Sequence, residues 1–273
     1  TFHQQDFSIT TEWERYSITF SPTAGTHSIY ITSQQGVSWY AWGAQFELGL
    51  VATDYIETTT TSVSAGILED MPRLDYSGGA SCPSLLLEPQ RTNLAPYSEL
   101  YGTSFINTTA TRNNATAPTG YNEATLLEDN NAVGEHLLGH NFGSITNGST
   151  YTISCFFKAD GSGGRAVIRY FVGNWIHAVY NLDNGTIANV NGAGTADIEN
   201  YGNGWYRCIL TATAVTDYAP FVTQIGIANS SNQFSYQGTS SLGLYFWGFQ
   251  AELGSYPTSY IPTYGTSQTR SGD

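Results

Sequence analysis

The residues best suited to binding a ligand lie between positions 165 and 181 of the chain. Five of them combine aromatic rings with groups that form hydrogen bonds: Arg169, Tyr170, Trp175, His177 and Tyr180. Sugar-binding surfaces use this combination, because a ring stacks on a pyranose while a few polar groups fix its hydroxyls. Gly173-Asn174 is a turn signal, so we expect the Trp175 ring at a loop or strand edge. The alternative is that Trp175 and Tyr170 fill a core, and Trp39 and Tyr40 face the same choice.

Catalytic chemistry is less well supported. Glycoside hydrolysis needs two carboxylates that flank one bond, but Glu47 and Glu252 each stand alone on a predicted strand. Carboxylates that are adjacent in the sequence, such as Glu69 and Asp70, fall in predicted loops. A polysaccharide lyase would need cationic residues and a proton-transfer pair such as Tyr170 and His177. The spacing of these two residues matches no lyase signature known to us, so we predict no enzymatic activity and assign no catalytic residue.

The cysteines and loop carboxylates do not define a metal centre. Cys82, Cys155 and Cys208 are an odd number of thiols and have no metal-ligand spacing. Cys155 and Cys208 lie on separate predicted strands that could become neighbours, which leaves both a disulfide and two buried thiols open. A structural Ca²⁺ could use loop oxygens of the following residues, although no regular ligand series assigns it: Asp183, Asn184 and Asp197.

Composition excludes several classes of partner. The chain has 273 residues, 22 Asp and Glu against nine Lys and Arg, and a net charge of −13. Binding nucleic acid requires a basic surface to neutralise phosphates, so we expect no nucleic-acid partner. No apolar run reaches the length of a membrane span. Neutral glycans carry no electrostatic penalty.

The elements that must position these residues are predicted to be short β-strands. Aromatic and β-branched runs are bounded by Gly, Asn and Ser clusters, and they fall at residues 16–20, 28–32, 37–48, 151–158, 165–172, 177–182, 205–214, 222–228 and 242–253. Asn184-Gly185 predicts a hairpin turn. Short helical turns are expected at residues 123–127 and 130–138. Many antiparallel strands with polar turns predict an all-β fold of jelly-roll sandwiches.

A long internal repeat divides the chain. AWGAQFELG at residues 41–49 returns as FWGFQAELG at residues 246–254, an offset of 205 residues that the pair Tyr55 and Tyr260 repeats. EWERYSITF at residues 12–20 matches GWYRCILTA at residues 204–212 less closely, at an offset of 192. The recurring tryptophans, in both copies, are predicted to be core residues: Trp13, Trp42, Trp205 and Trp247. The first copy begins about three-quarters of the way through a repeat, so we expect a section of a longer polypeptide.

These motifs resemble a known family. LLLEPQRTNL at residues 85–94, GNGWYRC at 202–208 and TSYIPT at 258–263, with the repeated Trp-Gly segment, are similar to carbohydrate-binding-like modules of phage tail fibre and head-spike proteins. Together they cover nearly the whole chain. The resemblance implies tandem jelly-roll sandwiches in fibrous or adhesive virion proteins, a sandwich also found as an accessory module of secreted bacterial polysaccharide-degrading enzymes. The matching motifs are framework motifs and carry over no sugar-contacting residue.

The sequence therefore predicts four segments. Residues 1–57 are the C-terminal part of a first β-sandwich, 58–91 a linker with a β-hairpin that docks on a neighbouring domain or subunit, 92–264 a complete sandwich, and 265–273 the start of a further linker. We predict a non-catalytic extracellular or virion fibre repeat that binds a surface polysaccharide or glycan and self-associates, as a trimer or filament. The alternative is a purely structural protein that assembles by strand complementation. A polysaccharide lyase or hydrolase is the third hypothesis.

Overall fold

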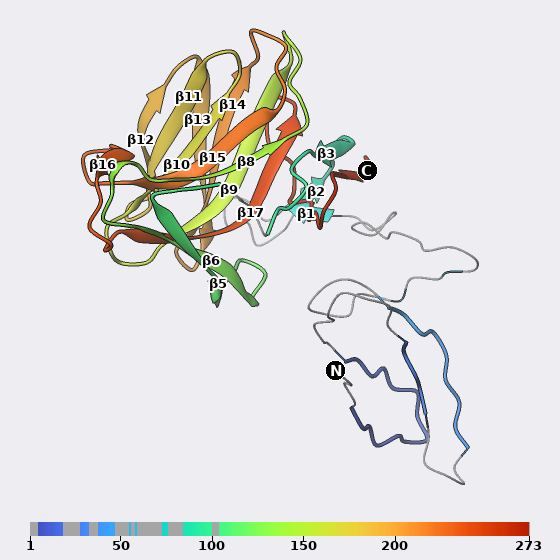
Figure 1. The fold of residues 1–273 in the computed structure, drawn as a ribbon. Helices are drawn as coiled ribbons and strands as arrows, with labels where there is room; N and C mark the ends of the chain where they lie inside the picture. The colour runs from blue at the N-terminus through green and yellow to red at the C-terminus, as the bar shows by residue number, and fades with distance from the viewer. Residues whose placement is uncertain are drawn as a thin grey trace. The chain divides into compact units, whose positions relative to one another are not determined.

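The chain forms two compact units, residues Thr1–Leu68 and Glu69–Asp273, which we call the first and the second unit. The computed structural model describes residues 5–18, 28–32, 38–46, 55, 58, 73–75, 84–99 and 104–272, and its ribbon is drawn in Figure 1. Among the described residues, no helix is long and apolar enough to cross a membrane.

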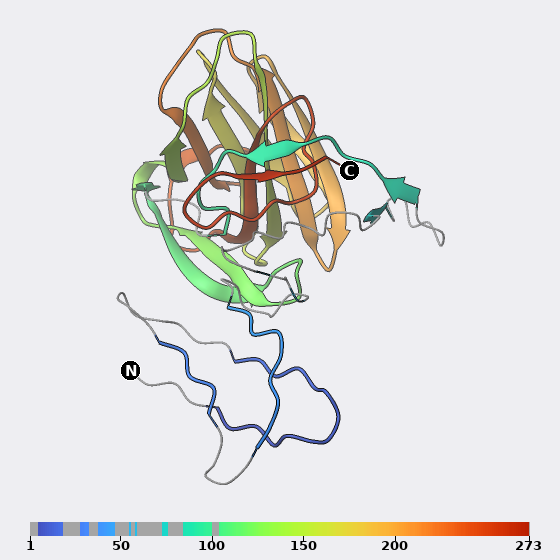
Figure 2. The same cartoon turned by 90° about the vertical axis from the view of Figure 1, so that its right-hand side faces the viewer.

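The second unit is a sandwich of two six-stranded antiparallel sheets, seen as two layers in Figures 1 and 2. The first sheet has the order β12 (Thr186–Asn191), β11 (Trp175–Asn181), β10 (Arg165–Phe171), β15 (Phe221–Ala228), β8 (Leu137–Phe142) and β4 (Ser104–Ile106). The second sheet has the order β13 (Gly194–Gly202), β14 (Trp205–Thr213), β9 (Thr150–Ala159), β17 (Gly243–Leu253), β6 (Asn122–Asp129) and β5 (Thr108–Thr116). This arrangement confirms the predicted all-β, jelly-roll type of sandwich.

Three further pairs of short strands are also antiparallel. β1 (Arg73–Asp75) pairs with β2 (Ser84–Leu86), β7 (Val133–Glu135) with β16 (Ser235–Gln237), and β3 (Arg91–Asn93) with β18 (Gln268–Arg270). The first pair confirms the predicted linker hairpin. Leu85 and Leu87 are 56% and 68% exposed, so these two leucines of the linker are not buried within this chain. Docking of the hairpin on another subunit stays a prediction.

Alternation along β9 separates two apolar clusters, as successive side chains of a strand point to opposite faces. Tyr151, Ile153 and Phe157 enter the main core between the two sheets. Phe156 points to the outer side of the second sheet and packs with Trp205 and Trp247. The two tryptophans are buried, which confirms the core prediction for the second copy of the repeat.

The repeated Gln-x-Glu of the framework motif anchors the C-terminal segment. The buried Glu252 carboxylate accepts hydrogen bonds from the Gln250 side-chain amide at 2.7 Å and from the Thr258 amide at 2.9 Å. From β3, Asn93 donates to the Ile261 carbonyl at 2.9 Å and accepts from the Ala251 amide at 3.0 Å. A buried carboxylate held this way is structural, since its oxygens are already engaged.

Cys155 and Cys208 face each other across the β9–β14 ladder and are free, buried thiols. The predicted proximity is therefore confirmed, with thiols in place of a disulfide. The Cys155 thiol lies 3.5 Å from the Trp247 carbonyl oxygen. Burial raises the pKa of both thiols, so both are protonated and unreactive at neutral pH. Cys82 lies outside the described residues.

Elsewhere in the second unit, most predicted strands are found within a few residues of their expected bounds, and the turn at Asn184-Gly185 joins β11 to β12. The predicted helical turns are wrong, because residues 123–127 lie in β6 and residues 130–138 include β7 and the start of β8. Leu127 faces the main core from β6, which is held by β5 and β17 on its two sides. In a short segment, apolar residues can fit both the helical period of about 3.6 residues and the strand period of two. Pairing with β5 and β17 decides in favour of the strand.

In the first unit, the predicted strands are not formed in the part of the chain that the structure describes. Residues 16–18, 28–32 and 38–46 contain no strand. Trp13 and Trp42 are 74% and 75% exposed, and Phe46 is 69% exposed, so the prediction that the two tryptophans are core residues is wrong for this unit. Their counterparts Trp205 and Trp247 are covered by β9, β6 and the end of β5. The described residues of the first unit form no strand that could cover the two rings in the same way.

The Trp-Gly motif nevertheless has the same local geometry in both units. Gly43 and Gly248 have φ of +67° and +64°, a left-handed conformation that favours glycine. The next aromatic pair is also reproduced: ring centroids lie 4.7 Å apart for Trp42 and Tyr55, and 4.4 Å apart for Trp247 and Tyr260. The repeat therefore determines local backbone conformation even where burial is not achieved.

Candidate functional site

The five candidate residues divide between the two faces of the first sheet. Arg169 pairs with His177 across the β10–β11 ladder, and Phe171 pairs with Trp175. Because side chains alternate along a strand, these four side chains lie on the outer face. Tyr170 and Tyr180 lie on the inner face, within the main core.

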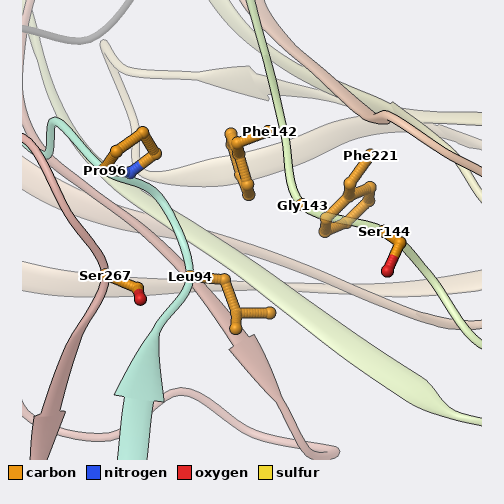
Figure 3. A pocket seen from close by; sticks show the side chains of 7 residues that line it. All are labelled: Leu94, Pro96, Phe142, Gly143, Ser144, Phe221 and Ser267. Atoms are coloured by element: carbon orange, nitrogen blue, oxygen red, sulfur yellow. The ribbon is translucent and has the colours of Figure 1, made fainter.

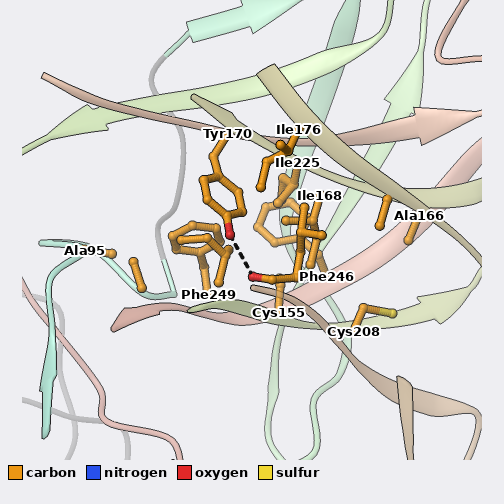
Figure 4. Close-up of a cluster of buried hydrophobic side chains, with 14 of the residues drawn as sticks. Ala95, Cys155, Ala166, Ile168, Tyr170, Ile176, Cys208, Ile225, Phe246 and Phe249 are labelled. Atoms are coloured by element: carbon orange, nitrogen blue, oxygen red, sulfur yellow. Dashed lines mark hydrogen bonds between the residues drawn. The ribbon is translucent and has the colours of Figure 1, made fainter. Parts of the chain in front are cut away.

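Tyr170 and Tyr180 are core residues, so the prediction that these two side chains contact a ligand is wrong. Neither ring is exposed, and Figure 4 shows Tyr170 pointing into the buried cluster. The Tyr170 hydroxyl donates to the carbonyls of Tyr151 and Leu210, each at 3.1 Å. The Tyr180 hydroxyl donates to the Ile209 carbonyl at 2.5 Å. Burial raises the pKa of both phenols well above its ordinary value, and the two side chains tie the sheets together.

Arg169 is the centre of a cluster on the outer face. Its guanidinium lies over the Trp175 ring at 4.1 Å and over the Phe234 ring at 5.4 Å. Its Nη1 also donates to Glu135 Oε1 at 2.8 Å, and the Arg169 side chain is only 13% exposed. A guanidinium held by an ion pair and two rings has one preferred position. The cluster is therefore preorganised by contributions from β7, β10, β11 and the loop before β16.

Trp175 presents its ring to solvent at the start of β11. The residue is 40% exposed at the first position of its strand, next to the predicted turn, which excludes the core alternative for this residue. Arg169 covers part of the indole, and Phe171 contacts it with ring centroids 5.5 Å apart.

His177 supplies a neutral polar group next to the indole. Its ring packs edge-on against Phe234 at a centroid distance of 4.9 Å. Partial burial lowers the pKa of His177, and the positive charge of Arg169 lowers it further. The imidazole is therefore neutral at pH 7 and offers one donor and one acceptor nitrogen.

Amide side chains surround this cluster. Asn191 lies opposite His177 on the edge strand β12, and Asn189 lies opposite Val179; both asparagines are exposed. On the other side, Gln224 of β15 lies opposite Arg169. Its buried Oε1 has no hydrogen-bond partner among the described residues. Rings flanked by amides form a surface suited to hydroxyl-rich ligands.

Two cavities lie next to each other where the loops at one end of the sandwich meet. The smaller, drawn in Figure 3, has a volume of about 290 Å³ and a mostly apolar lining: Leu94, Pro96, Phe142, Gly143, Ser144, Phe221 and Ser267. The larger, about 390 Å³, is a shallow depression that opens widely to solvent, and it is lined by Ser144, Ile145, Thr146, Asp217, Tyr218 and Ala219. Only the larger one contains a charged side chain, that of Asp217.

The geometry does not assemble the hypothetical catalytic and metal groups. Tyr170 and His177 lie on opposite faces of the first sheet, so they cannot share a substrate proton. Asp183 and Asn184 lie in the β11–β12 turn, and Asp197 lies on β13. Within the described ranges, no group of three or more His, Cys, Asp or Glu side chains is placed to hold a metal ion.

Several residues of the site were missed by the sequence analysis. Phe171 was detectable, because it lies two positions after Arg169 on the same strand and must share its face. Glu135, Phe234 and Gln224 come from segments that are distant in sequence, and no local pattern connects them with Arg169. In the first unit, Tyr40 is 91% exposed and Trp39 is partly buried, but the described residues around them form no strand that would position a site.

No protein-family model matches the chain, and no curated protein matches it. Among solved structures, one match is the N-terminal part of the Clostridium thermocellum endo-1,4-beta-D-xylanase 10B, containing CBM22-1 and GH10 modules and complexed with xylohexaose. The identity is 10% and the TM-score 0.30, over 64% of this chain and 30% of that chain. The chain thus matches under a third of that protein's length.

Proposed function

We propose that the second unit is a glycan-binding sandwich and that its outer face around Trp175 is the binding surface. The observation that carries the proposal is the exposed indole of Trp175, held in place by Arg169, which is in turn fixed by Glu135. A sugar ring would stack on the open part of the indole. His177 and Asn191, which lies opposite it on β12, would bind its hydroxyls.

The proposed role is attachment without catalysis. The chain would act as a repeat of an extracellular or virion fibre, such as a tail fibre or spike, that adheres to a surface polysaccharide. The resemblance of the framework motifs to fibre modules supports this setting. The separation of Tyr170 from His177 supports the absence of the lyase chemistry considered from the sequence.

A glycan array with the whole chain tests the binding proposal. We expect retention on neutral glycans, and binding about tenfold weaker for Trp175→Ala, as for a residue at the centre of a binding surface. Tyr121→Ala is the matched control, because Tyr121 is a 46% exposed aromatic residue at the β5–β6 turn. The proposal is wrong if no glycan is retained, or if Trp175→Ala binds as the unmodified chain does.

A second candidate function is self-association through the first unit. Its favouring observation is the large exposure of aromatic residues there, with Trp13 at 74%, Tyr40 at 91% and Trp42 at 75%, since burial of exposed apolar side chains favours association. Complementation of the second unit would require exchange, because β14 and β17 already occupy the matching positions. Sedimentation equilibrium distinguishes the cases: a mass of 29.6 kDa at all concentrations would exclude self-association.

A further inference from the structure

A ridge of aromatic rings leads from Trp175 away from the outer face and towards the loops. The Phe171 ring contacts Trp175 on one side, and it contacts Tyr218 on the other at a centroid distance of 4.8 Å. Tyr218 is 43% exposed, similar to Trp175 at 40%. Two exposed rings are therefore joined by a third, which belongs to the same strand as Arg169.

The far end of this ridge borders the larger cavity. Tyr218 and Asp217 line it together with the hydroxyl-bearing Ser144 and Thr146. One carboxylate oxygen of Asp217 accepts a hydrogen bond from the Asn147 amide at 2.8 Å. An anionic acceptor beside hydroxyls, next to an exposed ring, has the chemistry that a sugar unit with free hydroxyls requires.

The loops that form this end are fixed by backbone hydrogen bonds. Ile145 and Tyr218 form an antiparallel bridge, with N–H···O distances of 2.9 and 3.1 Å. The amide of Gly148 donates to the Ala214 carbonyl at 2.8 Å, and the amide of Val215 donates to the Val172 carbonyl at 2.9 Å. The loop between β14 and β15 is thus attached to the loops on either side of it, and Tyr218 is positioned before any ligand binds. Preorganisation of this kind lowers the cost of binding.

The charges along the path favour an uncharged ligand. At the Trp175 end, the guanidinium of Arg169 is already paired with Glu135 at 2.8 Å. At the Tyr218 end, the charged group lining the cavity is the carboxylate of Asp217. A uronic acid would find no unpaired cation at the first end and a like charge at the second.

We propose that Tyr218, with Asp217 and the adjoining cavity, is a second subsite, and that the ligand is a neutral oligosaccharide chain that extends from Trp175 across Phe171 to Tyr218. This inference rests on the proposed glycan-binding function. It adds that the surface recognises a run of several sugar units rather than a single terminal residue, and that it discriminates against acidic polysaccharides.

Chain-length dependence tests the second subsite. The whole chain would be titrated calorimetrically with cello-, manno- and xylohexaose, with the corresponding disaccharides, and with oligogalacturonate as the acidic probe. We expect Trp175→Ala to weaken binding of both lengths. Tyr218→Ala should weaken hexasaccharide binding about tenfold and leave disaccharide binding within twofold of the unmodified chain. Oligogalacturonate should bind at least tenfold more weakly than the preferred neutral hexasaccharide.

Two matched variants separate the ring of Tyr218 from its surroundings. Tyr218→Phe keeps the stacking surface and should retain hexasaccharide binding, whereas Tyr121→Ala removes an exposed ring elsewhere and should have no effect. Thermal melting of each variant confirms that the sandwich is folded. If Tyr218→Ala binds both the disaccharide and the hexasaccharide as tightly as the unmodified chain does, the second subsite is overturned and the proposed function stands. Equal losses for both lengths would also overturn it, and absence of binding to every neutral glycan would remove both proposals.

Discussion

Arg169 shows how one residue can serve both stability and recognition. Its guanidinium is almost covered, and removing an ion-pair partner from a covered charge costs more than forming the pair gains. Glu135 and the faces of Trp175 and Phe234 together compensate for the lost hydration. The indole is consequently held in one orientation, which is what a stacking surface needs, because an unrestrained ring would lose rotamer freedom on binding.

His177 predicts a pH dependence of stability. Its pKa in the folded chain lies below the ordinary value of 6.5, because of burial and the charge of Arg169. As pH falls through 6.5, the unfolded chain binds the proton first, so stability is greatest above pH 6.5 and is lost as pH falls through the folded pKa. We expect the free energy of unfolding, measured by urea denaturation between pH 7.5 and pH 5.5, to decrease.

The variant His177→Asn isolates this contribution. Its decline over the same pH range should be shallower than that of the unmodified chain. A residual decline is expected, because burial also lowers the pKa of His140. An identical slope in the two proteins would show that His177 does not titrate differently in the folded and unfolded chains.

Residue identity alone suggested five site residues, and strand alternation explains which of them were misplaced. Arg169 and Tyr170 are neighbours on one strand and cannot share a face. His177 and Tyr180 are three positions apart and also differ in parity. The parity of these positions is a property of the sequence, so the division between the two faces follows from the strand assignment alone. The positions of Glu135 and Phe234 could not be inferred, since strand pairing over long sequence distances brings them to Arg169.

At the level of elements, the Trp-Gly motif interrupts the regular pairing of β17. The register with β9 shifts between Trp247 and Gln250, and Gly248 has φ of +64° at this point. Such a bulge reorients the strand locally, and here it places Trp247 against Tyr260 at 4.4 Å. The same φ at Gly43 indicates that the motif encodes this irregularity directly in the sequence.

Gly248→Ala should therefore destabilise the second unit. An alanine in the left-handed region costs about 1–2 kcal/mol, and the added Cβ would lie 3.0 Å from Phe156 Cδ2 and 3.3 Å from Tyr260 Cε2. Gly202→Ala is the control, because Gly202 has φ of +78° and no heavy atom within 4 Å of the added Cβ. Urea denaturation should show a larger loss of unfolding free energy for Gly248→Ala, and equal losses would mean that the packing around Phe156 is not tight.

Strand prediction succeeded in the second unit because each run there has partners. β9 lies between β14 and β17, so its apolar alternation is matched on both sides. The corresponding segments of the first unit carry similar patterns but form no ladder in their described parts. The apolar alternation of a strand determines which of its residues can face a core. Whether a core forms depends on neighbouring strands, which lie elsewhere in the sequence.

At the level of the whole molecule, the segments that lead into and out of the sandwich are joined to each other. β3 and β18 pair in antiparallel orientation, and a Cβ on Gly272 would lie 3.0 Å from the Gln90 amide nitrogen. The ion pair between Arg270 and Glu88, at 3.0 Å, is nearly buried. The segments at residues 88–93 and 268–272 therefore lie side by side on the second unit, and the linker from Glu88 onward is part of the folded sandwich.

Limited proteolysis of the whole chain should divide it according to this description. Chymotrypsin cleaves after exposed aromatic residues, and Trp13, Tyr40 and Trp42 are each at least 74% exposed, whereas Trp205 and Trp247 are buried. Cleavage of a native chain requires local opening, which is costly in a hydrogen-bonded sandwich. We expect rapid cuts within residues 5–46 and a resistant fragment that begins between residues 47 and 88 and extends to about residue 272, identified by mass spectrometry. The urea-unfolded chain, cut in both units, is the control.

The same digestion tests whether chains associate through the first unit. Because association would cover the exposed rings, the digestion is repeated over a range of chain concentrations. Protection of Trp13 and Trp42 that grows with concentration would indicate self-association through the first unit. Protection equal to that of Trp205 at every concentration would show that the first unit buries these rings within its own chain.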